Sequence, residues 1–124
     1  MYTVTVSETF VAQHYLTVPD PGPEGDLHSH TFTAAVEFAG SELGEYGYLL
    51  DIDDAVEAVE AAAERYRDAT LNDLPEIEGN PSAERLAAAF GDRVADRVDA
   101  PAAETMTVTV REDDVAEVSN RRAL

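Results

Sequence analysis

The side chains best suited to chemistry in this sequence are its three histidines, His14, His28 and His30. His28 and His30 are two positions apart, so on an extended strand their imidazole rings point to the same face. A third imidazole from a neighbouring strand would complete three nitrogen ligands, the ligand set of a catalytic zinc ion whose fourth position is open. The alternative is three unrelated structural histidines, and their clustering favours the metal site. Histidine ligands alone leave iron and manganese open as well.

Such a centre would have a defined chemistry. Three neutral histidines leave a bound zinc ion its full positive charge, so the ion can polarise a ligated oxygen and lower the pKa of a hydroxyl group or water. This suits a reaction at a carbonyl or at an adjacent alcohol, and with zinc it excludes a redox role for the metal.

Two strands are predicted to position the histidines. Residues 2–16 alternate between apolar and polar side chains, and alternation resumes over 28–39, which is the pattern of strands with one buried face. Residues 17–27 between them are rich in Pro and Gly and predict a loop. All three histidines then lie on the apolar faces of successive strands, where an imidazole needs a polar partner. A metal ion would supply that partner.

The rest of the sequence predicts two helices and two more strands. Residues 48–52 are interpreted as a short strand that leads into the first helix. Asn80 and Pro81 predict the start of a second helix, with Asn80 as its cap. Final strands are predicted over 104–112 and 115–121. The order ββ-αα-ββ is that of an α+β protein.

Three carboxylates could act beside the histidines. Glu24 and Asp26 lie in the predicted loop, and either could transfer protons or be one more surface acid. Glu112 shares parity with the apolar Val110, so it is predicted to face inward, where a carboxylate needs a partner. A ligand with two adjacent N–H donors would satisfy it bidentately. Alternatively, the strand ends at Arg111 and Glu112 faces solvent.

Composition narrows the possible partners. The sequence has 26 acidic residues and 8 basic ones, all arginine, for a net charge of −18. This charge repels nucleic acids and anionic membranes, so neither is expected as a partner. The absence of lysine and the even spread of acid indicate a halophilic protein whose self-repulsion is screened by a salt-rich cytoplasm.

Residues 1–124 are predicted to form a single domain, of a size that often gains stability by forming oligomers. The sequence contains no cysteine, which leaves no disulfide, thiolate ligand or cysteine nucleophile. We find neither a signal-peptide pattern nor an apolar run of membrane length, and therefore expect a soluble, cytoplasmic protein.

Several segments carry motifs that occur in the same order in one enzyme family. They are Phe10-Val11-Ala12-Gln13-His14, His28-Ser29-His30, Gly47-Tyr48-Leu49-Leu50-Asp51-Ile52, Leu71-Asn72, Pro81-Ser82-Ala83-Glu84-Arg85-Leu86-Ala87 and Val108-Thr109-Val110-Arg111-Glu112-Asp113. The ordered set resembles the 6-pyruvoyl-tetrahydropterin synthases and the related 6-carboxytetrahydropterin synthases. The resemblance runs nearly end to end, and it is the order of the motifs that makes it specific.

The resemblance implies the tunnelling fold, in which a four-stranded antiparallel sheet carries two helices on one face. It also implies homotrimers formed by edge pairing, often stacked into homohexamers, with sites at subunit interfaces. By the same resemblance, His14, His28 and His30 would hold Zn²⁺, and Glu112 would anchor the pterin ring of the substrate through its N–H edge.

The sequence departs from the family in its catalytic residues. The synthases of the family use a cysteine in the loop before the second histidine motif, and this chain has none. Arg67 and Asp68 stand where the family has an aspartate–histidine pair. Relatives with a glutamate in place of the loop cysteine resemble dihydroneopterin aldolases in outcome, and Glu24 lies where that exchange would place it.

The sequence therefore predicts a zinc-dependent lyase that cleaves the side chain of 7,8-dihydroneopterin, or of its triphosphate, towards 6-hydroxymethyl-7,8-dihydropterin. Glu24 is the expected acid–base catalyst, and Asp68 could assist it. One alternative is a 6-carboxy-5,6,7,8-tetrahydropterin synthase of queuosine and archaeosine precursor synthesis. Another is a non-catalytic paralogue that binds metal or pterin. The missing catalytic residues favour the paralogue, and the retained histidines oppose it.

Overall fold

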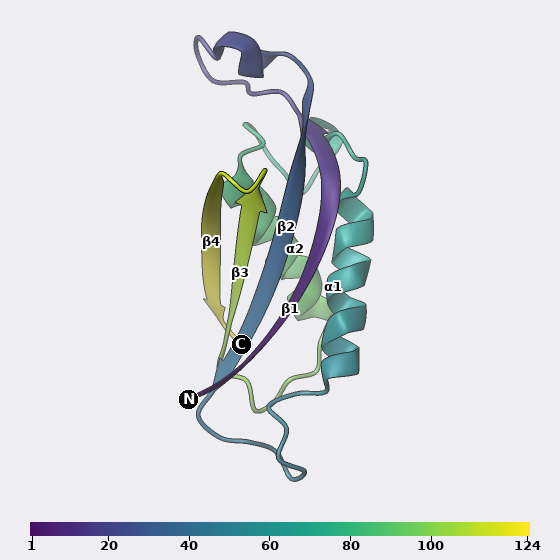
Figure 1. The fold of residues 1–124 in the computed structure, drawn as a ribbon, viewed down its shortest axis with the longest axis vertical. Helices are drawn as coiled ribbons and strands as arrows, with labels where there is room; N and C mark the ends of the chain where they lie inside the picture. The colour runs from purple at the N-terminus through teal and green to yellow at the C-terminus, as the bar shows by residue number, and fades with distance from the viewer.

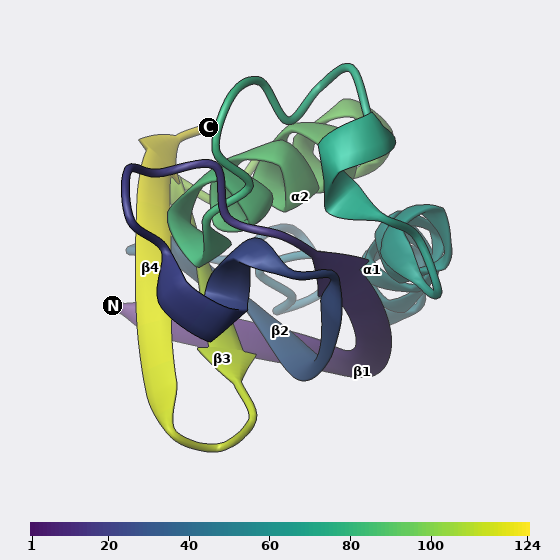
Figure 2. The same ribbon diagram turned by 90° about the horizontal axis from the view of Figure 1, so that it is seen from above.

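The computed structural model describes residues 1–124 as one four-stranded sheet with two α-helices (Figure 1). The elements in order are β1 (Tyr2–His14), η1 (Gly22–Gly25), β2 (His28–Gly40), α1 (Ile52–Tyr66), η2 (Leu71–Asp73), α2 (Ala83–Arg97), β3 (Thr105–Glu112) and β4 (Ala116–Ala123). The strands pair antiparallel in the order β1-β2-β3-β4. Both helices lie on one face of the sheet, as Figure 2 shows. The predicted element order, antiparallel sheet and helix placement are confirmed.

The core lies between the helices and the inward face of the sheet. Phe10 of β1 and Phe32 of β2 are buried there, together with the apolar stripes of both helices. The ring of Phe10 stacks on Phe90 of α2 with centroids 6.0 Å apart, and the ring of Tyr66 of α1 lies 6.1 Å from that of Phe90. Burial of each such side chain contributes about 1.5–3 kcal/mol. The aromatic cluster therefore holds both helices against the two strands that carry the histidines.

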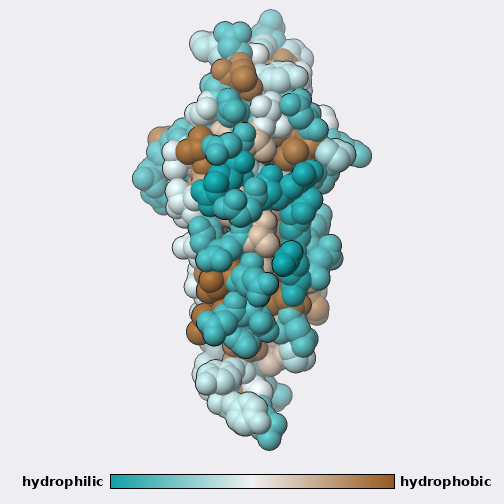
Figure 3. Space-filling model, turned by 90° about the vertical axis from the view of Figure 1, so that its right-hand side faces the viewer, coloured by the Kyte–Doolittle hydropathy of each residue, from teal (hydrophilic) through white to brown (hydrophobic).

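The opposite face of the sheet is polar. Thr9 and Thr33 are register partners across β1 and β2, and their hydroxyl oxygens lie 3.0 Å apart. Figure 3 shows the side of the molecule that carries α1, where hydrophilic residues cover most of the surface and apolar atoms form separate patches. Neither helix is long and apolar enough to cross a membrane.

The prediction of a short strand over 48–52 is wrong. Asp51 caps α1 instead, because its side chain accepts the backbone N–H groups of Asp53 and Asp54. Leu49 and Leu50 are buried in the core without pairing to any strand. Their apolar side chains, which suggested a strand, pack into the core just before α1 begins.

The predicted helix cap at Asn80 is also wrong. Ser82 caps α2 by accepting the backbone N–H of Arg85 at 3.2 Å, so the helix begins at Ala83. The side-chain oxygen of Asn80 instead accepts the backbone N–H of Thr17 at 2.9 Å. This bond ties the loop between β1 and β2 to the segment that leads into α2.

Strand β1 ends at His14, two residues before the predicted end at residue 16. The backbone of Tyr15 pairs with the side chain of Asn72 rather than with β2: its N–H donates to Oδ1 at 3.0 Å and its carbonyl accepts from Nδ2 at 2.9 Å. Strand β4 begins and ends slightly later than predicted, because Val115 belongs to the turn that precedes it. The chain therefore leaves β1 immediately after its histidine.

Candidate metal centre

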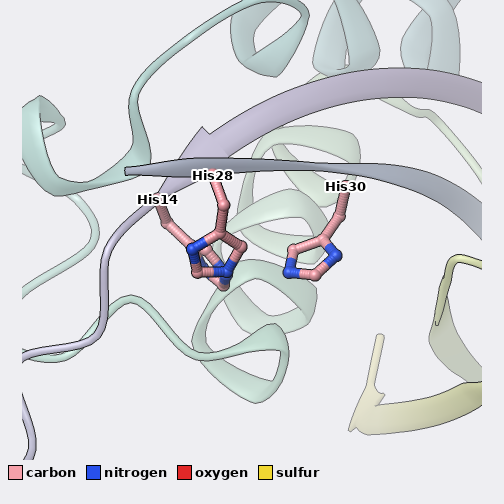
Figure 4. Close-up of side chains that lie close together, drawn as sticks. All are labelled: His14, His28 and His30. Carbon is pink, nitrogen blue, oxygen red and sulfur yellow. The ribbon is translucent and has the colours of Figure 1, made fainter. Parts of the chain in front are cut away.

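The three histidines meet at one end of the β1–β2 pair. His14 and His28 are direct register partners, and His30 lies two residues further along β2, opposite Ala12. All three rings project to the same side of the strands (Figure 4). Their centroids lie 4.6 Å (His14–His28), 4.7 Å (His28–His30) and 5.0 Å (His14–His30) apart. One nitrogen from each ring lies within 4.8 Å of the other two, so the group could hold a metal ion.

Each ring is oriented by an acceptor at its Nδ1 atom. His14 Nδ1 lies 2.8 Å from the carbonyl oxygen of Pro81, and His28 Nδ1 lies 2.7 Å from that of Asp26. His30 Nδ1 contacts the carboxylate of Asp113. Since a carbonyl or carboxylate oxygen only accepts, each Nδ1 carries a proton, and Nε2 is the ring nitrogen left to bind a metal. An acceptor at the far nitrogen is the usual arrangement for a metal-binding histidine.

The Nε2 atoms of His28 and His30 are buried and have no hydrogen-bond partner. A buried polar group left in this state costs about 1–3 kcal/mol. Two unsatisfied nitrogens within one cluster of three imidazoles could be satisfied by one shared partner. A divalent cation with nitrogen ligands is such a partner, so these residues fit a zinc ion.

Burial, the largest cause, lowers the pKa of His14 below its ordinary value of 6.5. Its side chain is almost fully enclosed, at 4% exposure. Positive charge on the neighbouring rings of His28 and His30 would also lower this pKa by repulsion. His14 is therefore neutral at physiological pH, and the neutral imidazole is the form that binds metals.

Glu112 faces the same group from β3. It pairs with Phe32 in the register and is half-buried, so the strand includes Glu112 rather than ending at Arg111. Its Oε1 lies 2.9 Å from His30 Nε2, although the two atoms are not aligned as a hydrogen bond. A carboxylate facing a nitrogen lone pair at this distance is favourable only with a proton or a cation nearby.

A cleft of about 230 Å³ opens beside the histidines. Its lining residues come from the loop after β1, the start of α2 and the ends of β3 and β4: His14, Leu16, Glu24, Asn80, Ser82, Ala83, Glu84, Glu112 and Val118. The predicted residues Glu24 and Glu112 thus share one cleft with His14. A larger hollow, of about 560 Å³, lies around Tyr46 and Tyr48 and contains none of the histidines.

The two other acids are placed differently. Asp26 contributes its backbone carbonyl to His28, and it is not among the residues that line the cleft. Asp68 is exposed beside the outer edge of β1, where its backbone N–H donates to the carbonyl of Val11 at 2.7 Å. Within one chain, the structure does not bring Asp68 to the histidines or to the cleft.

Sequence reasoning missed Asp113 and Glu84. Asp113 contacts His30, which is 83 residues away in the sequence, and it also accepts the backbone N–H of Thr31. Glu84 lies on the first turn of α2 and lines the cleft. The available signal for Asp113 was its position directly after Glu112, at the start of a turn.

The comparison with known families decides the identity of the chain. The sequence profile described as 6-pyruvoyl tetrahydropterin synthase matches residues 3–123. The chain belongs to the 6-pyruvoyl tetrahydropterin synthase family. Members of this family are metal-dependent enzymes that act on pterins, and the three-histidine group found here could bind a metal. A comparison with curated protein sequences gives no significant match.

Solved structures of other proteins share the fold. A Plasmodium vivax 6-pyruvoyltetrahydropterin synthase, as the alanine variant of a catalytic glutamate, has a TM-score of 0.83 at 15% identity and covers 99% of this chain and 98% of its own. The Caenorhabditis elegans enzyme has a TM-score of 0.81 at 15% identity, with 98% and 95% covered. A Burkholderia thailendensis dihydroneopterin aldolase bound to guanine has a TM-score of 0.50 at 10% identity, with 99% and 91% covered. These likenesses confirm the tunnelling fold.

Proposed function

We propose that this protein is a zinc-dependent lyase that cleaves the side chain of 7,8-dihydroneopterin, or of its triphosphate, towards 6-hydroxymethyl-7,8-dihydropterin. The observation that carries the proposal is the convergence of three histidines beside a cleft that also holds Glu24 and Glu112. When bound, zinc would supply positive charge that polarises the oxygens of the substrate side chain. His14, His28 and His30 would hold the ion through their Nε2 atoms.

Glu112 is proposed to anchor the pterin ring. Its carboxylate is half-buried at the mouth of the histidine group and makes no hydrogen bond within the chain that would satisfy it. A ring edge with two adjacent N–H donors would fill both oxygens in a bidentate contact. The anchored ring would direct the six-position side chain of the substrate towards the histidines.

Glu24 is proposed to hold and move the proton during cleavage. It lines the cleft, and it is the one glutamate in the loop between β1 and β2. The exposed position of its carboxylate allows exchange of the proton with solvent between turnovers. The catalytic glutamate of the Plasmodium vivax enzyme is consistent with a glutamate in this role. Asp26 remains the competing acid, and it is disfavoured because it is not among the residues that line the cleft.

Asp68 could assist only from a second subunit. Strands β1 and β4 are the outer strands of the sheet, and residues 68–70 bond to the outer edge of β1 only near its C-terminal end. The rest of that edge is unpaired within the chain, and an unpaired strand edge invites pairing with another chain. We propose a homotrimer or homohexamer built through these edges. Asp68 lies along the outer edge of β1. Edge pairing would therefore place it at a subunit boundary.

The charge of the cleft favours the unphosphorylated substrate. Glu24, Glu84 and Glu112 line it, and no arginine does. Arg67, the cation nearest in sequence to the proposed assisting acid, is held by Glu64 at 2.8 Å and by the carbonyl of Thr9 at 3.3 Å. A triphosphate would meet like charge here, whereas a polyol side chain would not.

The net charge of −18 further suggests a halophilic, cytoplasmic enzyme, with no nucleic-acid or membrane partner.

The test is incubation of the zinc-loaded protein with 7,8-dihydroneopterin and, separately, with its triphosphate, followed by product fluorescence and mass. Formation of 6-hydroxymethyl-7,8-dihydropterin, faster from the unphosphorylated substrate, supports the proposal. Formation of 6-carboxy-5,6,7,8-tetrahydropterin would assign the chain to queuosine and archaeosine precursor synthesis instead. Binding of pterin without turnover would make it a non-catalytic paralogue.

A further inference from the structure

The turn between β3 and β4 has an unusual backbone for its residues. Asp113 and Asp114 both have positive φ, at 51° and 57°, and the N–H of Val115 donates to the carbonyl of Glu112 at 3.0 Å. Two consecutive left-handed residues define the tight hairpin turn in which Asn-Gly is preferred. Glycine is free of the steric penalty that aspartate carries here. A side-chain function at one of these positions would explain why aspartate is present.

Asp113 reaches from this turn to the strand that bears two of the histidines. One carboxylate oxygen accepts from His30 Nδ1, and the other accepts the backbone N–H of Thr31 at 2.8 Å. The backbone N–H of Asp113 in turn donates to the carbonyl of Thr31 at 2.9 Å. These three contacts fix the carboxylate relative to the His30 ring.

The acceptor behind His30 differs from those behind the other two rings. His14 and His28 donate to neutral backbone carbonyls, whereas His30 donates to a charged carboxylate. Hydrogen bonds to an ionised group are about twice as strong as neutral ones. A carboxylate behind a metal-binding imidazole also makes the ring a stronger donor to the metal. His30 is therefore the ring whose orientation and ligand strength depend on a side chain that mutation can remove.

We propose that Asp113 is a positioning residue of the metal centre, which sets the affinity for zinc by orienting and polarising His30. The inference rests on the proposed zinc site at the three histidines. It assigns to Asp113 a role in metal affinity, separate from its role in the turn. The competing explanation is that Asp113 only stabilises the hairpin.

Asp114 provides a matched control. It occupies the neighbouring left-handed position of the same turn and carries the same charge. Its side chain pairs with Arg111 at 2.9 Å, is largely exposed and contacts no histidine. Asp113→Asn and Asp114→Asn therefore remove equal charge from one turn, and only the first alters the acceptor behind His30. Asparagine also tolerates positive φ, so both variants should fold.

The experiment measures the dissociation constant for Zn²⁺ of the full chain by competition with a chromophoric chelator, and the melting temperature of the metal-free protein. We expect Asp113→Asn to weaken zinc binding by about 10- to 100-fold, and Asp114→Asn to change it by less than about threefold. Asp113→Gly, which relieves the backbone and removes the carboxylate, should lose the same affinity while keeping or raising the melting temperature.

Equal zinc affinities for the Asp113→Asn, Asp114→Asn and wild-type proteins would overturn the proposal. So would an Asp113→Gly variant that binds zinc like the wild type. A purely structural role would lower the melting temperature and leave zinc affinity unchanged. A wild-type protein that binds no zinc would instead remove the metal centre itself, and with it the proposed function.

Discussion

Replacement of Glu112 by glutamine tests how the site recognises a pterin. The carboxylate is 29% exposed, and its Oε1 lies 2.9 Å from His30 Nε2. Glutamine keeps the shape and one acceptor oxygen, and it puts an NH₂ group against the second N–H donor of the pterin edge. Hydrogen bonds to charged groups contribute about 1.5–3 kcal/mol, and neutral ones about 0.5–1.5 kcal/mol. The loss of charge and of one bond should therefore cost about 2–3 kcal/mol.

This energy corresponds to roughly a 30- to 150-fold weaker affinity for 7,8-dihydroneopterin. The assay is quenching of pterin fluorescence by the zinc-loaded protein, with zinc content measured on the same samples. Glu117→Gln on β4 is the control, because Glu117 pairs with Arg111 at 3.5 Å and does not line the cleft.

Unchanged pterin affinity in Glu112→Gln would refute the anchoring role. Loss of zinc with unchanged pterin affinity would show that Glu112 helps to bind the metal. This role is worth testing because Glu112 Oε1 lies 2.9 Å from His30 Nε2.

Three further predictions concern catalysis, acid stability and salt. Glu24→Gln should abolish cleavage while zinc and pterin binding persist, whereas Asp26→Asn should retain most of the activity. If a product assay instead shows that Asp26→Asn loses activity and Glu24→Gln keeps it, Asp26 is the acid–base catalyst. The hydrogen bond from Arg65 lowers the pKa of Glu76 from 4.5 to about 2, so the stability that Glu76 contributes is present above about pH 4.5 and lost as pH falls towards 2. With allowance for solvent screening, Glu76→Gln should cost about 1–2 kcal/mol at pH 7 in urea unfolding, and a gap that persists at pH 2 would contradict this origin. Because the chain carries a net charge of −18, its melting temperature should rise steeply between low and molar potassium chloride, and a flat dependence would contradict adaptation to salt.

The sequence was a good guide wherever one residue's environment follows from its neighbours along the chain. Alternation placed the histidines of β1 and β2 and the carboxylate of Glu112 on the inward face, because side chains on a strand alternate between its faces. The helical spacing of Leu86, Phe90 and Val94 predicts one buried stripe, and all three are buried in α2.

The sequence was a poor guide where competing local signals look alike. Leu49 and Leu50 suit a strand as well as a buried approach to a helix, and only the absence of a pairing partner distinguishes the two. Asn80 and Ser82 are both good helix caps, and the choice was decided by the backbone N–H of Thr17, which Asn80 binds across 63 residues.

Contacts between distant segments were out of reach altogether. No local pattern in the sequence predicts that Asp113, which lies in a turn, contacts His30. Asp68 lies beside β1, where its backbone N–H donates to the carbonyl of Val11, and no local pattern in the sequence predicts that contact.

The central claim is that three imidazole rings bind one divalent cation, and the most direct test is X-ray absorption of the protein after titration with zinc. We predict one zinc per chain, with three nitrogen ligands at about 2.0–2.1 Å, and loss of the bound metal in His14→Ala. A protein that takes up no zinc, or whose zinc shows only oxygen ligands, would contradict the account.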